Sequence, residues 1–265
     1  MRYLFVLITY AFGFASCAQQ PPPVGEALQP QTETYPFQLG ETPVMLSKIT
    51  YGSAQPYIFV QLHHNEATAG AAAERFLQQH GGVLLRIENG GDRFVSFRLK
   101  GTTYQFDPNR MFTPSGIAIS LRLLSTYRPE AAREVAQFSA FLLDHLPDTA
   151  LVIAVHNNTP DNYTIHSYRQ DRDLIADAAA LHINEDLDAD NFFLTTDEAH
   201  FQQLQARKQN VVLQHNEQAK DDGSLSILYG RQNKAYINVE AEYGHLEAQT
   251  EMLRLLKTLL FHNPI

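Results

Sequence analysis

The sequence predicts an α/β fold in which a mixed, mostly parallel sheet carries helices on both faces. Short apolar segments of strand length alternate along the chain with amphipathic segments of helix length. The strongest strand, residues 150–155 (ALVIAV), is apolar at every position, which is typical of a strand covered on both sides. A chain of 265 residues that is 44% hydrophobic and 18% charged is also large and apolar enough to bury such a sheet.

The N-terminal residues are expected to be an export signal. Residues 3–14 are apolar, follow a basic start and are too short to span a bilayer. Residues 14–17 (FASC) resemble the lipobox of bacterial lipoproteins, so we predict a signal peptide over 1–16 and a lipid on Cys17. Cleavage after Ala18 is the alternative. Lipidation would attach the protein to the membrane through this lipid only, as an exported lipoprotein of the cell envelope (periplasmic or outer-membrane).

The segment after the signal is expected to be a tether. Residues 17–43 are rich in Pro, Gln, Thr and Glu, and the three prolines at 21–23 favour an extended, semi-rigid chain. We therefore predict that the folded domain covers residues 44–265.

The first part of this domain reads as strand, helix, strand, strand. Residues 56–62 form an apolar run of strand length. Residues 67–80 are alanine-rich with helical spacing, and the following glycine pair at 81–82 ends the helix. Residues 83–88 and 92–99 read as two further strands.

The second part alternates in the same way. A long amphipathic helix over 129–146 begins at a proline, which suits the first turn of a helix. The strand at 150–155 follows it. A short apolar strand over 236–239 and a closing helix over 250–261 complete the pattern.

Histidine and glutamate residues follow three of the apolar strands, where α/β sheets bind their ligands. His63 and Glu66 are three apart, so a turn entering a helix places both on one side. With His156 they form a His₂Glu set, which holds catalytic zinc and leaves one position for water. Such a metal polarises a carbonyl and acidifies water, and a carboxylate must then carry the proton. Glu240 directly follows its strand and is preferred for this role over Glu242, two positions on and facing the same way.

This series resembles the ordered motifs of the zinc carboxypeptidase family, including its desuccinylase and aspartoacylase branch. That branch often begins with His-Gly-Asn-Glu, compared with His-His-Asn-Glu at 63–66, and residues 107–112 (DPNRMF) resemble the family's Asp-Leu-Asn-Arg-x-Phe. The resemblance implies a carboxypeptidase-like (phosphorylase/hydrolase-like) fold and one zinc ion on His63, Glu66 and His156. It also implies that Asn109 and Arg110 grip a substrate carboxylate and that Glu240 is the general acid/base.

Some assignments stay open in the sequence. The family arginine that polarises the scissile carbonyl has three candidates, Arg86, Arg93 and Arg98. The family tyrosine that caps the substrate has two candidates in this sequence, Tyr229 and Tyr236. His64 is expected not to bind metal, because its spacing to Glu66 is two rather than three.

The expected function is zinc-dependent hydrolysis of an amide bond next to a free carboxylate, as in a metallopeptidase acting on a peptide or a peptidoglycan stem peptide. One alternative is an acyl-amino-acid amidohydrolase of the desuccinylase/aspartoacylase type. A second is an envelope lipoprotein that binds metal without catalysis. The net charge of −9 and the absence of a Lys/Arg run argue against nucleic acid as a partner. The single cysteine excludes a disulfide framework.

Overall fold

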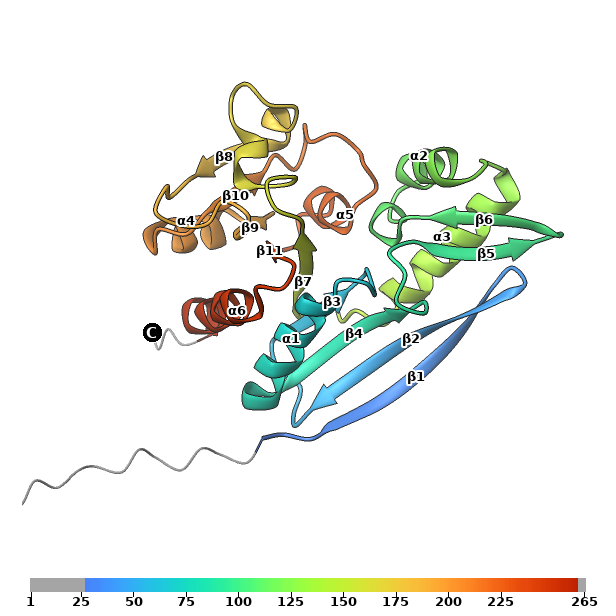
Figure 1. The fold of residues 1–265 in the computed structure, drawn as a ribbon, viewed down its shortest axis with the longest axis horizontal. Coiled ribbons are helices and arrows are strands. Elements are labelled where there is room, and N and C mark those ends of the chain that lie inside the picture. The colour runs from blue at the N-terminus through green and yellow to red at the C-terminus, as the bar shows by residue number, and fades with distance from the viewer. Residues whose placement is uncertain (1–26, 262–265) are drawn as a thin grey trace, which may run out of the picture.

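The computed structural model describes residues 27–261, so the predicted signal peptide, Cys17 and the first part of the predicted tether lie outside the described residues. The main sheet consists of β1 (Pro30–Leu39), β2 (Thr42–Tyr51), β3 (Tyr57–Gln61), β4 (Gly82–Glu88), β7 (Leu151–Asn158), β8 (Ala178–His182), β9 (Phe192–Thr195), β10 (Val211–Gln214) and β11 (Tyr236–Glu242). Their spatial order is β1-β2-β4-β3-β7-β11-β9-β10-β8 (Figure 1).

The remaining elements lie on the faces and at the ends of this sheet. The helices are α1 (Ala67–His80), α2 (Pro114–Leu124), α3 (Pro129–Leu143), α4 (Glu198–Ala206), α5 (Leu225–Arg231) and α6 (Leu246–Phe261). Three short 3₁₀ turns are η1 (Pro108–Arg110), η2 (Ile165–Tyr168) and η3 (Ile175–Asp177). A separate antiparallel hairpin consists of β5 (Val95–Leu99) and β6 (Thr102–Phe106).

The centre of the sheet is parallel and its flanks are mixed. β4, β3, β7 and β11 run in one direction as consecutive neighbours. β2 joins β4, and β9 joins β11, in antiparallel pairs. The predicted α/β class with a mixed sheet is confirmed. Because the parallel strands are consecutive, their carboxyl ends meet at one edge of the sheet.

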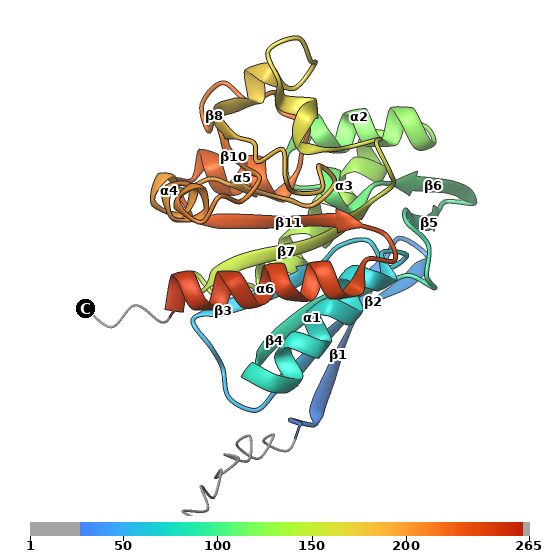
Figure 2. The same ribbon diagram turned by 60° about the vertical axis from the view of Figure 1, so that its left-hand side comes forward.

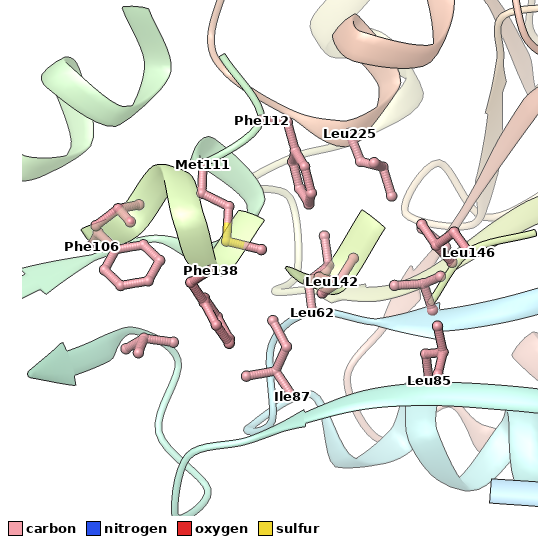
Figure 3. Packing of buried hydrophobic residues seen from close by; sticks show 14 of the residues in the cluster. Leu62, Leu85, Ile87, Phe106, Met111, Phe112, Phe138, Leu142, Leu146 and Leu225 are labelled. Carbon is pink, nitrogen blue, oxygen red and sulfur yellow. The ribbon is translucent and has the colours of Figure 1, made fainter. Parts of the chain in front are cut away.

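Alternating side chains of the central strands enter two separate cores. Ile58 and Val60 of β3 pack in the core beneath α2, α3 and α5, where Phe138 is also buried. Tyr57 and Phe59 point to the opposite face, into the core beneath α1, α4 and α6. Figure 2 shows α1 and α6 on one side of the sheet, and Figure 3 shows Phe138 and Leu142 of α3 against strand residues of the first core. Helices on both faces follow from the period-2 alternation of a buried strand.

The predicted start of the domain at residue 44 is wrong. Residues 30–43, assigned to the tether, form β1 and the turn into β2, in register as Tyr35↔Leu46 and Phe37↔Val44. Phe37 packs on Phe138 of α3 at 5.3 Å between ring centroids, and Leu39 is fully buried. β1 is an edge strand, where prolines such as Pro36 are tolerated because one side of the strand needs no ladder partner.

The other predicted elements appear with small changes of boundary. β7 and β11 each extend beyond their predicted ends, so His156 and Glu240 lie on the last part of a strand and not after it. The closing helix α6 begins at Leu246 instead of residue 250. Among residues 27–261, no helix combines the length and the hydrophobicity that crossing a bilayer requires.

Candidate metal centre and active-site cavity

Three neighbouring parallel strands deliver the predicted metal ligands and the predicted base to one edge of the sheet. His63 follows the end of β3, His156 lies on β7, and Glu240 lies on β11 directly beside His156 in the strand register. Glu66 is the residue before the first turn of α1. All four side chains are buried, and all line one cavity of about 520 Å³.

The donor atoms of His63, Glu66 and His156 have the spacing of a metal coordination shell. The two Nδ1 atoms are 3.4 Å apart. Glu66 Oε1 is 3.0 Å from His63 Nδ1, and Oε2 is 2.9 Å from His156 Nδ1. Tetrahedral ligands about 2.1 Å from a zinc ion are separated by about 3.4 Å. The chemistry and the spacing of this donor set therefore fit zinc.

Asp107 orients one of the histidines from behind. Its Oδ1 lies 2.7 Å from His63 Nε2, on the side of the ring away from Glu66. In the neutral ring, a proton on Nε2 donates to this carboxylate and leaves the Nδ1 lone pair free, which is the usual arrangement around a metal-binding histidine. His156 Nε2 is buried and has no hydrogen-bond partner among the described residues. The sequence placed Asp107 in the motif at 107–112 but did not predict its contact with His63.

The electrostatics of the cluster agree with a cation site. Burial alone would lower the pKa of His63, but the nearby carboxylates of Glu66 and Asp107 outweigh it and raise that pKa to about 9. Burial would raise the pKa of Glu66, yet the two histidines hold it well below its usual value. The pKa of Asp107 falls to about 2, because the hydrogen bond and charge of His63 outweigh burial. The buried carboxylates thus favour positive charge between them.

Buried hydrogen bonds hold the turn between the two ligands of the first motif. Gln61 Nε2 donates to the carbonyl oxygens of His63 at 3.2 Å and Glu66 at 3.0 Å. Its Oε1 accepts from Arg86 Nε at 2.7 Å. Gly70 lies directly over this amide, and a Cβ there would be 2.5 Å from Gln61 Oε1. The close packing fixes the direction in which both ligands leave the turn.

Glu240, and not Glu242, lines the cavity. Glu240 is buried, and its Oε1 accepts a 2.9 Å hydrogen bond from Asn238, which lies two residues earlier on the same face of β11. Burial raises the pKa of Glu240. Glu242 lies closer to the surface, 3.4 Å from His245. Glu242 and His245 form a second group of possible metal ligands together with Asp188. This group is largely exposed, and exposed groups of this kind are common without an ion.

Of the three candidate arginines, only Arg93 lines the cavity. Its Nη1 donates to Glu66 Oε1 at 2.8 Å, while its side chain remains 44% exposed. Arg86 pairs with Gln61 and Glu74 behind the metal cluster. Arg98 is an exposed residue of β5, 4.0 Å from Glu41. The sequence left these three open because only the packing of the loop after β4 separates them.

Asn109 and Arg110, the residues predicted to bind a substrate carboxylate, lie in η1 and line the cavity. Asn109 Oδ1 accepts from the backbone N–H of Leu225 at 3.2 Å, which links η1 to the start of α5. Arg110 Nη1 lies 3.3 Å from Asp222 Oδ2 and is part-exposed. Asp222 was not predicted as a neighbour of Arg110. The guanidinium of Arg110 is therefore already paired with a carboxylate at the cavity wall.

Buried tyrosines form another part of the cavity wall. Tyr236 lines it, whereas Tyr229 lines a different cavity at the opposite end of the strands. Tyr163 and Tyr168, which were not predicted from the sequence, also line the first of these cavities, and their hydroxyl oxygens are 2.5 Å apart. Burial raises the pKa of both hydroxyls. They belong to the long connection after β7, which shows no periodic pattern from which they could have been predicted.

No protein-family model and no curated protein matches this chain. Solved structures with a similar arrangement include murein-tripeptide amidase MpaA from Escherichia coli O157, with 13% identity, a TM-score of 0.47 and coverage of 93% of this chain and 98% of that chain. An aspartoacylase family protein from Mesorhizobium loti has 17% identity, a TM-score of 0.47 and coverage of 88% and 68%. A succinylglutamate desuccinylase from Silicibacter has 11% identity, a TM-score of 0.45 and coverage of 90% and 69%.

The similarity to these structures concerns the arrangement of the chain.

Proposed function

We propose that this protein is a zinc-dependent hydrolase that cleaves an amide bond next to a free carboxylate. The supporting observation is the buried cluster of two imidazole Nδ1 atoms and one carboxylate, with mutual distances of 2.9–3.4 Å, in the wall of a polar cavity. Glu240 on the neighbouring strand adds a second, protonatable carboxylate beside it. A metal site with an adjacent acid/base group is the arrangement that hydrolysis of an unactivated amide requires.

His63, Glu66 and His156 would hold the zinc ion. When bound, zinc supplies Lewis-acid polarisation and lowers the pKa of water. Asp107 keeps the His63 ring turned with Nδ1 toward the cluster. Gln61 keeps the backbone of the intervening turn in place.

Two residues of the cavity would act on the substrate amide. Glu240 would accept a proton from water as a carboxylate and then deliver it to the departing nitrogen, and its raised pKa suits a group that must be ionised in one step and protonated in the next. Arg93 would donate to the carbonyl oxygen as negative charge develops there. Its contact with Glu66 keeps the guanidinium beside the cluster.

Arg110, with Asn109, would select the free carboxylate of the substrate. A guanidinium can donate to both carboxylate oxygens at once, which favours this group over a neutral amide. The substrate class would be peptides, including peptidoglycan stem peptides, or acylated amino acids, since both place a carboxylate near the scissile bond. Lipidation of Cys17 and location in the cell envelope remain part of the proposal as predictions from the sequence.

The test of this proposal is metal analysis of the purified protein combined with turnover. We expect one zinc per chain after equilibration with the ion and hydrolysis of acylated amino acids or short peptides. A chelator should abolish that hydrolysis, and added zinc should restore it. Protein that takes up no divalent metal, or that hydrolyses its substrate equally well after chelation, would exclude the metal-dependent mechanism.

Arg110→Ala is expected to reduce kcat/KM for a substrate with a free carboxylate by roughly 10- to 100-fold, the effect of losing a charged hydrogen bond. For the same substrate with its carboxylate converted to a neutral amide, the kcat/KM of the variant should stay near the wild-type value. Arg98→Ala is the matched control, because Arg98 is exposed and lies outside the cavity. Equal losses for the two substrates would contradict the carboxylate role.

A further inference from the structure

Among the described residues, the imidazole of His64 makes polar contacts with the end of β4 and with the loop that follows it. Its Nδ1 accepts hydrogen bonds from the backbone N–H groups of Asn89 at 3.1 Å and Gly91 at 3.2 Å. Its Nε2 lies 3.1 Å from Glu88 Oε2. Because Nδ1 accepts twice, the ring proton is on Nε2 and donates to Glu88. The imidazole therefore uses both nitrogens to hold this segment.

The segment is otherwise weakly constrained. Gly90 and Gly91 have positive φ values of 79° and 85°, and a Cβ on either would meet nothing within 4 Å. Residues 90–93 are exposed. Asn89 Nδ2 donates to Phe94 O at 3.1 Å, which closes residues 89–94 into a compact loop. A loop with adjacent exposed glycines needs such contacts to keep one conformation.

This loop carries Arg93, the arginine of the active-site cavity. Arg93 Nη1 contacts Glu66 Oε1 at 2.8 Å, and Glu66 lies two residues after His64. The His63–Glu66 turn thus holds the loop at two places. His64 fixes the loop near its start, and Glu66 meets the guanidinium near its end.

We propose that His64 is a positioning residue that holds the 89–94 loop so that Arg93 faces the substrate carbonyl. This rests on the proposed function, because it assumes that Arg93 acts on the substrate. His64 itself does not line the cavity. A displacement of about 1 Å in a catalytic group is enough to reduce turnover by on the order of 100-fold.

The test compares His64→Ala with His64→Asn. The Asn side chain offers Oδ1 where the imidazole has Nδ1, so it can still accept from Asn89 and Gly91. We expect His64→Ala to lower kcat by on the order of 10- to 100-fold with one zinc still bound. We expect His64→Asn to recover most of that loss. His182→Ala is the control, since the side chain of that histidine hydrogen-bonds to the carbonyl oxygen of Gln209 at the far edge of the sheet.

A readout independent of turnover is amide hydrogen exchange of the metal-free protein. Protection at Asn89 and Gly91 should fall about fivefold or more in His64→Ala, the effect of losing one hydrogen bond. It should stay near the wild-type level in His64→Asn. In an Arg93→Ala background, His64→Ala should cause little further loss of kcat, because the group that it positions is already absent.

Wild-type exchange and wild-type kcat in His64→Ala would overturn the proposal. A full additional loss of kcat in the Arg93→Ala background would also overturn it, by showing that His64 acts independently of Arg93. If the wild-type protein has no hydrolytic activity, the proposed function fails. The exchange experiment still decides whether His64 holds the loop.

Discussion

Glu240→Gln is expected to lower kcat by about 10²- to 10⁴-fold, the usual contribution of a general acid/base, while zinc remains bound at one ion per chain. Glutamine has nearly the same shape but cannot take up and release the proton. Glu240 is not among the three predicted ligands, so metal content should be unchanged. The measurements are steady-state hydrolysis and elemental analysis of the same preparation.

Glu242→Gln is the matched control, because Glu242 is two positions along the same strand but near the surface, beside His245. It should keep wild-type kcat. The result that contradicts the role of Glu240 is a Glu240→Gln protein with kcat near the wild-type value. If the wild-type protein binds zinc and shows no turnover with any substrate tested, the non-catalytic binding protein becomes the better interpretation.

Glu66→Gln is expected to weaken zinc binding by more than about 100-fold, beyond the 10- to 100-fold typical of residues that only orient a ligand. The substitution removes the single charge that faces both imidazole Nδ1 atoms, at 3.0 and 2.9 Å. Hydrolysis should be lost together with the metal. Zinc affinity is measured by competition with a chromogenic chelator, and folding by the thermal unfolding midpoint.

Asp107→Asn provides a graded comparison, because Asp107 contacts His63 on the side away from Glu66. Zinc binding by Asp107→Asn should be about 10- to 100-fold weaker than in the wild-type protein. Glu74→Gln should leave zinc affinity unchanged, since Glu74 pairs with Arg86 behind the cluster. If Glu66→Gln binds zinc as tightly as the wild-type protein, the proposed coordination is wrong.

Local patterns were sufficient for the central strands and for the helices α1, α3 and α6, whereas α2, α4 and α5 were not predicted. The strands β3, β4, β7 and β11 each contain a run of apolar residues that is buried in the sheet, and such runs are easily recognised in the sequence. The flanking strands β8, β9 and β10 are short, and β1 contains two prolines, so neither length nor composition marked them. β1 is held by pairing with β2, the next strand in the chain, and β9 is held between β11 and β10.

The order of the motifs, the candidate ligands His63, Glu66 and His156, and their positions near strand ends could be predicted from the sequence alone, because strand periodicity and residue spacing are local properties. Only the tertiary structure showed which glutamate and which arginine line the cavity, namely Glu240 and Arg93. It also showed that Asp107 contacts His63 and that Asp222 contacts Arg110. It placed residues 30–43 in the sheet. These outcomes depend on which strands become neighbours and on where a loop packs. Such contacts are made through space between segments whose separation along the chain carries no signal of their meeting.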